Sequence, residues 1–151
     1  MKSSNLFQIF ICLCAILLIS TIAQAQTLQN ASIKFHTTND DKDNDTHVTV
    51  DIMNGNGTVV AHIDNDFGHF NDNSDNGPYD IPISGTLNLS DMPRGSVKIR
   101  IDPNGHDTWN FNYFLNMTFS DGTPVNQSNS NISLKNQSEQ IFGLNTATSG
   151  K

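Results

Sequence analysis

The sequence predicts an all-β fold, an antiparallel β-sandwich of about eight strands. Apolar and polar residues alternate along most of the chain, and this period of two is typical of half-buried strands. Gly, Asn, Asp and Pro separate the alternating segments at short intervals, as turns do. Beyond the first 25 residues, no segment has the period of 3.6 residues that indicates an amphipathic helix. Many short strands joined by turns are the pattern of two packed antiparallel sheets.

The strands of the first half are defined by apolar residues two positions apart. Ile33 and Phe35 mark the first strand, and the segments 48–52 and 59–63 are the next two. The run Asn54-Gly55-Asn56-Gly57 joins these two segments and predicts a hairpin, because Asn-Gly accepts the positive φ of a tight turn. Shorter strands are expected at Ile81–Ile83, where Pro82 favours a sheet edge, at Leu87 and Leu89, at 97–101 and at 141–144.

The clearest strand extends from Trp109 to Phe119. Every second residue is apolar, and the residues between them are mostly Asn and Thr, so one face of this strand belongs to a core. Phe114 is the exception on the polar face. The apolar face comprises Trp109, Phe111, Tyr113, Leu115, Met117 and Phe119. The regular alternation favours core packing of the aromatic residues over a sugar-binding platform made by Trp109, Phe111 and Tyr113.

Three polar segments lie between or after these strands. Residues 64–78 form a long loop rich in Asn, Asp and Gly, and we expect its two aromatic residues, Phe67 and Phe70, to pack into the core. Residues 123–138 are dominated by Asn, Gln and Ser, a composition that predicts flexibility. Residues 145–151 are expected to be a flexible tail.

The first 25 residues are interpreted as a secretory signal peptide. Lys2 precedes an apolar run, and Ala23-Gln24-Ala25 fits the small-residue cleavage pattern, so the mature chain would begin at Gln26. The remaining chain would be one β-sandwich domain over 26–144, secreted or, in a bacterium, periplasmic, with no transmembrane segment. We expect it to be a monomer. Both cysteines lie in the leader, so no disulfide stabilises the domain.

The charge balance and the missing motifs exclude several classes of function. The chain has fifteen acidic residues against eight Lys and Arg, a net charge of −7, which argues against nucleic acid as a partner. It lacks a G-x-S-x-G motif, a cysteine nucleophile outside the leader and an H-E-x-x-H motif, so we expect no enzyme. The five histidines are scattered, without the local spacing of a zinc site.

A dense acidic segment, Asp40-Asp41-Lys42-Asp43-Asn44-Asp45, separates the first two strands. Four carboxylates this close repel one another, and a hard cation with oxygen ligands would hold them together. We therefore predict a calcium site formed by Asp40, Asp41, Asp43 and Asp45. The segment is not an EF-hand, because Thr46 and Ile52 stand where that loop requires Gly and Glu.

The order of these motifs resembles the PLAT domain, the lipoxygenase-homology β-sandwich. The resemblance covers about residues 31–121: a strand, the acidic loop, Asp45-Thr46-x-Val48-x-Val50, then Val97-x-Ile99-x-Ile101 and Trp109 opening a long strand. It implies an accessory module that binds a lipid surface or a protein, often with calcium at loops on one end. It also implies that the loop 102–107 lies beside the acidic loop, so that Asp102 and Asp107 add oxygen ligands.

The leading hypothesis is therefore a secreted, calcium-dependent binding module that engages a lipid surface, a glycan or a protein through loops at one end. Two alternatives stay open. One is a structural or surface-coat protein in which Asp and Asn serve only solubility and turns. The other is a small secreted hydrolase with an Asp-based site at Asp102 and Asp107.

Overall fold

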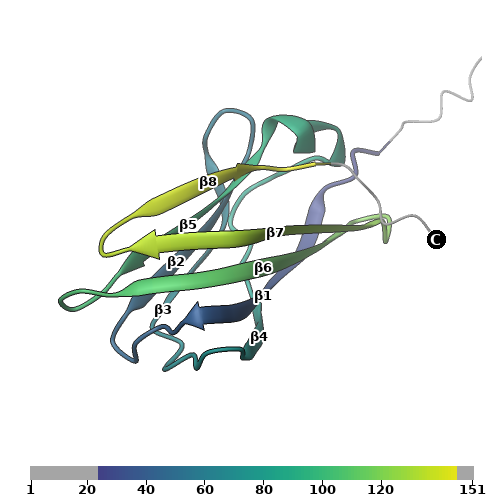
Figure 1. Ribbon diagram of the computed structural model, residues 1–151. Helices are drawn as coiled ribbons and strands as arrows, with labels where there is room; N and C mark the ends of the chain where they lie inside the picture. Colours follow the sequence, from purple (N-terminus) through teal and green to yellow (C-terminus); the bar gives the residue numbers. More distant parts are fainter. Residues whose placement is uncertain (1–23, 146–151) are drawn as a thin grey trace, which may run out of the picture.

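Two four-stranded antiparallel sheets pack face to face in the computed structural model, which describes residues 24–145 (Figure 1). The predicted sandwich is thus confirmed. In spatial order, the first sheet comprises β4 (Asp75–Asp80), β1 (Leu28–Asp40), β6 (Thr108–Phe119) and β7 (Pro124–Lys135). The second comprises β3 (Val59–Asn65), β2 (His47–Met53), β5 (Ser96–Asp102) and β8 (Glu139–Gly143). No helix among residues 24–145 is long and apolar enough to cross a membrane.

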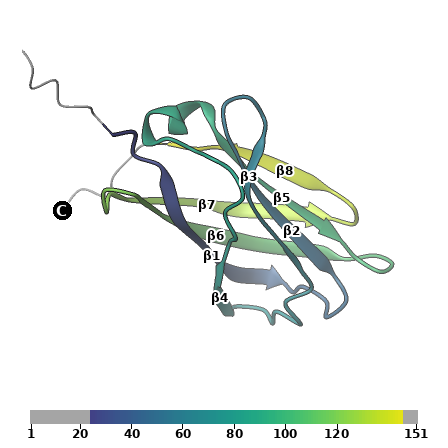
Figure 2. The ribbon, with the colours of Figure 1, turned by 180° about the vertical axis from the view of Figure 1, so that it is seen from behind.

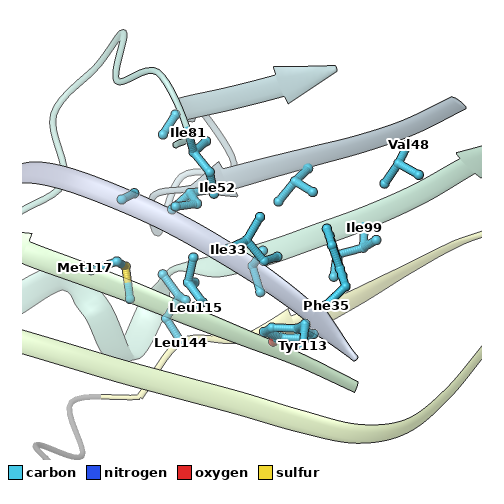
Figure 3. Packing of buried hydrophobic residues seen from close by; sticks show 14 of the residues in the cluster. Ile33, Phe35, Val48, Ile52, Ile81, Ile99, Tyr113, Leu115, Met117 and Leu144 are labelled. Atoms are coloured by element: carbon cyan, nitrogen blue, oxygen red, sulfur yellow. The ribbon is translucent and has the colours of Figure 1, made fainter. Parts of the chain in front are cut away.

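The core lies between the two sheets, where their apolar side chains point toward one another (Figure 3). The six predicted apolar residues of β6 are all buried, whereas Phe114 on the opposite face is 43% exposed. Trp109, Phe111 and Tyr113 are therefore core residues, as their alternation predicts. Trp109 donates its indole N–H to the hydroxyl of Thr37 at 3.0 Å, so its one polar atom has a partner.

Phe70 anchors the long polar loop between β3 and β4 to this core. Its ring is buried and lies 5.7 Å from Trp109 and 6.2 Å from Phe35, measured between ring centroids. Phe67 is half-buried and packs on Tyr79 at 4.3 Å. The prediction that both phenylalanines pack into the core is confirmed for Phe70. Phe67 is only partly buried and packs against the edge of the core.

The segment between β4 and β5 differs from the prediction. No strand forms at 81–83: Ile81 donates its N–H to Ala31 of the first sheet, while Ser84 donates to Val60 of the second. The chain crosses here from one sheet to the other and pairs with the edge strand β3 only through an isolated bridge between Ile83 and Ala61, in which the His62 N–H donates to Pro82 at 3.0 Å. The predicted edge position of Pro82 is therefore present, although no strand forms. Leu89 opens a 3₁₀ helix, η1 (Leu89–Arg94), instead of a strand. Pro93 lies inside η1 and lacks the N–H that a strand ladder would use.

The prediction of a flexible segment at 123–138 is wrong, because most of it is the twelve-residue strand β7, paired with β6. Val125, Ile132 and Leu134 are buried. Val125 and Ile132 are an odd number of residues apart, because one extra residue of β7 bulges opposite β6 and reverses the alternation. The polar residues Gln127 and Asn129 occupy inward positions and donate to the Tyr113 hydroxyl. The expected leader and tail fall largely outside residues 24–145.

Candidate functional site

Three loops meet at one end of the sandwich and form what we call the acidic tip: residues 40–46, 66–73 and 102–107 (Figure 2). Lys42 and Phe70 exchange two backbone hydrogen bonds, of 3.1 and 3.0 Å, which join the first two loops. The backbone N–H of Asp43 donates to Asp107 Oδ2 at 3.3 Å, and the Thr46 hydroxyl donates to the same oxygen, which joins the third. The predicted neighbourhood of the loops 40–45 and 102–107 is therefore present.

Lys42, in the middle of the acidic loop, is fully buried. Its ammonium donates to three backbone carbonyls: Asp43 at 2.9 Å, Thr46 at 2.9 Å and Asp66 at 2.7 Å. The Phe70 ring lies below it, 5.0 Å from ring centroid to Nζ, within the range of a cation–π contact. Three N–H donors thus meet three acceptors. The Lys42 ammonium, an internal cation, therefore orders the acidic loop.

Burial lowers the pKa of Lys42, because the charged form loses its hydration. The carboxylates of Asp107, Asp66, Asp43 and Asp45 act in the opposite direction and recover part of this shift. The acidic residues of the tip therefore stabilise the buried ammonium, and the ammonium in turn offsets their mutual repulsion.

Two of the six predicted ligands converge at a common point. Asp41 and Asp43 meet His69, and one ligand atom from each of the three residues lies within 4.8 Å of the others. His69 Nε2 is 3.3 Å from Asp41 Oδ2. All three side chains reach solvent, so an ion could enter without a conformational change. Two carboxylates and one imidazole are a donor set that divalent metals accept.

The other four predicted ligands have different surroundings. Asp107 accepts hydrogen bonds from the 43–46 segment, as described above, and so positions the loop. Asp102 forms a two-point contact with Arg100, at 2.6 and 2.5 Å, and this hydrogen bonding lowers its pKa. Asp45 is exposed in the turn that precedes Thr46.

Asp40 ends β1 opposite Asn110, outside the converging group. Partial burial, together with the nearby carboxylates of Asp41, Asp107 and Asp72, raises its pKa.

Sequence reasoning missed Lys42 and His69. The role of Lys42 depends on the Asp66 carbonyl and the Phe70 ring, which come from another loop, so nothing within 40–46 indicates its burial. A signal for His69 did exist. His69 immediately precedes Phe70. A buried aromatic residue in a polar loop fixes the position of the residues next to it, so the burial of Phe70 holds His69 at the protein surface.

His47, at the start of β2, faces two carboxylates at the margin of the tip. Nδ1 lies 2.5 Å from Asp66 Oδ1, and Nε2 contacts Asp64. Both ring nitrogens can donate only when the imidazole is protonated. The hydrogen bond with Asp66 raises the pKa of His47, partial burial opposes it, and Asp64 adds to it.

This raised pKa predicts a pH dependence of stability. A raised folded-state pKa contributes stability that is complete below the unfolded value of about 6.5 and is lost as pH rises through the folded value. The side chain is 39% exposed, so water limits the effect to at most about 1 kcal/mol. Chemical denaturation at pH 6 and pH 8 should show the decrease, and His47→Gln should reduce it. His106→Gln, which removes a ring that faces the Asn136 amide oxygen instead of a carboxylate, is the control and should retain the wild-type dependence.

No protein-family model, curated protein or solved structure matches the chain.

Proposed function

We propose that the protein is a secreted binding module whose acidic tip captures a divalent cation through Asp41, Asp43 and His69. The observation that carries this proposal is the convergence of these three side chains, from two different loops, within 4.8 Å. The PLAT resemblance, which implies a binding role with a cation at loops on one end, supports the same reading.

The buried Lys42 prepares this site. In extended backbone, successive side chains point to opposite sides, so an inward Lys42 directs both Asp41 and Asp43 outward on one face. Phe70 is fixed in the core and presents His69 beside them. The donors are therefore held in place before an ion arrives, which lowers the entropic cost of binding it.

The sequence predicts calcium, which would use both carboxylates together with loop carbonyls and water. The presence of His69 is a specific reason to consider a second class of ion, because imidazole suits zinc better than calcium. In either case, a cation held by three side chains keeps open positions. It could bridge to an anionic group on a lipid surface, a glycan or a protein.

Of the two alternatives, the Asp-based hydrolase gains least support. Asp102 is paired with Arg100, and Asp107 accepts hydrogen bonds from Asp43 and Thr46. Neither carboxylate is poised to act on a substrate water, which favours a binding role over a hydrolytic one. The other alternative, a structural or surface-coat protein without a binding site, gives no reason for Asp41, Asp43 and His69 to converge.

Calorimetric titration of EDTA-treated protein with calcium, manganese and zinc tests the proposal. We expect one ion to bind, with stabilisation of about 2.7 kcal/mol at a hundredfold excess over the dissociation constant. The double change Asp41→Asn with Asp43→Asn should abolish binding of every ion. His69→Gln should weaken the binding of zinc far more than that of calcium or manganese. Asp80→Asn, an exposed carboxylate on β4, is the matched control and should bind as the wild type does. Absence of binding for all three ions, or unchanged binding by the double variant, would refute the proposal.

A further inference from the structure

Beyond the leader, the chain is rich in the triplet Asn-x-Ser/Thr, at which enzymes of a secretory pathway attach oligosaccharides. Residues 26–151 contain nineteen Asn and twenty-three Ser and Thr, so random placement would give about three or four such triplets. The reversed triplet Ser/Thr-x-Asn, which strand alternation favours equally, occurs four times. Composition and alternation therefore account for only part of the eight that are present, which begin at Asn30, Asn44, Asn56, Asn88, Asn116, Asn126, Asn131 and Asn136.

The structure distinguishes these eight asparagines from the other eleven beyond the leader. Seven of the eight are exposed, against six of the eleven. Among the eight, only Asn88 and Asn136 have a side-chain hydrogen bond within residues 24–145. The side-chain amide is hydrogen-bonded in seven of the eleven: Asn39, Asn54, Asn65, Asn76, Asn110, Asn112 and Asn129. Most asparagines of the triplets thus present a free amide to solvent, whereas most of the others hold the backbone or a neighbouring side chain.

The β2–β3 hairpin shows this difference within a single turn. Asn54 Oδ1 accepts the backbone N–H groups of Asn56 and Thr58, both at 3.1 Å, and so shapes the turn. The Asn56 side chain is exposed and has no hydrogen-bond partner among the described residues. Gly57 beside it has open space, since an added Cβ would meet no atom within 4 Å. The hairpin projects from the sandwich, so a bulky group on Asn56 would extend into solvent (Figure 2).

Strand β6 shows the same difference on the outer face of the first sheet. The amides of Asn110 and Asn112 are hydrogen-bonded, whereas that of Asn116 is exposed and has no partner in the described part of the chain. Its neighbours across the sheet are Ser32 of β1 and Asn126 of β7. Asn126 begins a triplet itself, and its Cβ lies about 5 Å from that of Asn116, as in any direct cross-strand pair. One oligosaccharide on either residue would therefore fill the space above both.

We propose that the protein is N-glycosylated, at Asn56 in the β2–β3 hairpin and at one residue of the pair Asn116 and Asn126. Asn88 stays unmodified, because it is only partly exposed and its Nδ2 donates to Asp91 Oδ2 at 2.9 Å at the start of η1. A bulky, solvated group at the chosen sites leaves the core and both sheets undisturbed.

The reaction joins Nδ2 of the asparagine to the anomeric carbon of the first sugar. A lipid-linked oligosaccharide is the donor. The bond from its anomeric carbon to the pyrophosphate oxygen breaks, the lipid pyrophosphate leaves with the electron pair, and Nδ2 releases one proton. A secretory pathway supplies this donor, so the inference rests on the secretion proposed above and not on the cation site.

Mass spectrometry of the protein secreted by its natural source tests the proposal. Peptide-N-glycosidase in ¹⁸O-labelled water converts each glycosylated asparagine into a labelled aspartate. We expect the label at Asn56 and at Asn116 or Asn126, and no label at Asn88. The readout requires no metal, so a failure of cation binding would leave this result unaffected. A native protein that the enzyme leaves unchanged, or a label confined to Asn88, would overturn the proposal.

Two variants of the full chain, with its leader and made in a eukaryotic secretory host, test the hairpin site. Thr58→Ala keeps Asn56 but destroys its triplet, so the secreted protein should lose one oligosaccharide. Thr58→Ser is the matched control and should keep it, because serine also completes the triplet. The Thr58 side chain is exposed and has no hydrogen bond among the described residues, so both variants should fold. Equal numbers of oligosaccharides on the two variants would contradict the assignment of Asn56.

Discussion

Replacement of Lys42 with methionine is expected to destabilise the protein by about 3–5 kcal/mol. Methionine has nearly the same length but no N–H donor. The carbonyls of Asp43, Thr46 and Asp66 would lose their shared partner, and the carboxylates of the tip would lose the internal charge that offsets their repulsion. A decrease of roughly 10–15 °C in melting temperature should accompany the change. Urea denaturation followed by tryptophan fluorescence would measure it, since Trp109 reports on the core.

Lys34→Met is the matched control for this experiment. Lys34 also contacts an aspartate, Asp75 at 2.9 Å, but its side chain is 38% exposed and the pair lies on the surface. Such exposed pairs contribute little to stability, so Lys34→Met should unfold close to the wild type. If the two variants lost equal amounts of stability, the buried ammonium would have no special role in the tip.

The second large effect is expected for Phe70→Ala, with a loss of about 3–5 kcal/mol. The Phe70 ring packs on Phe35 and Trp109 in the core and supports the Lys42 ammonium from below. Removing it would leave a cavity and release the segment that carries His69. We therefore expect cation binding to be lost together with stability. Titration calorimetry below the melting temperature would measure the loss of binding, and urea denaturation would measure the loss of stability.

Phe114→Ala provides the comparison, because the same side chain is removed from an exposed position of β6. Its effect on stability should stay below about 1 kcal/mol, and its cation binding should be unchanged. If the Phe70→Ala variant were destabilised but bound cations as tightly as the wild type, the position of His69 would not depend on Phe70. That result would contradict this account.

The alternating strands could be predicted because each carries its own signal. β6 is the clearest case, since six inward apolar residues at a period of two leave no other arrangement. β7 could not be predicted in the same way. Its inward Gln127 and Asn129 are satisfied by the Tyr113 hydroxyl, and its bulge reverses the alternation, so the apolar pattern is interrupted twice. Both interruptions depend on the partner strand.

The acidic tip was only partly predictable for a related reason. Its location follows from the density of Asp in 40–45, but its organisation depends on Lys42, whose partners lie in another loop. The ion pair between Asp102 and Arg100, in contrast, could have been predicted from the sequence. Arg100 is two residues away on the same strand, and side chains two apart share a face, so an ion pair between them is favoured over a role in metal binding.

Titration of isotope-labelled protein with paramagnetic manganese, followed by NMR, tests most directly whether the acidic tip is a cation site. At substoichiometric manganese, we predict that the amide signals of Asp41, Asp43 and His69 broaden first. Signals of the β2–β3 hairpin at the opposite end should stay sharp. Broadening that is spread evenly over the exposed aspartates, or that leaves residues 41, 43 and 69 unaffected, would contradict the account.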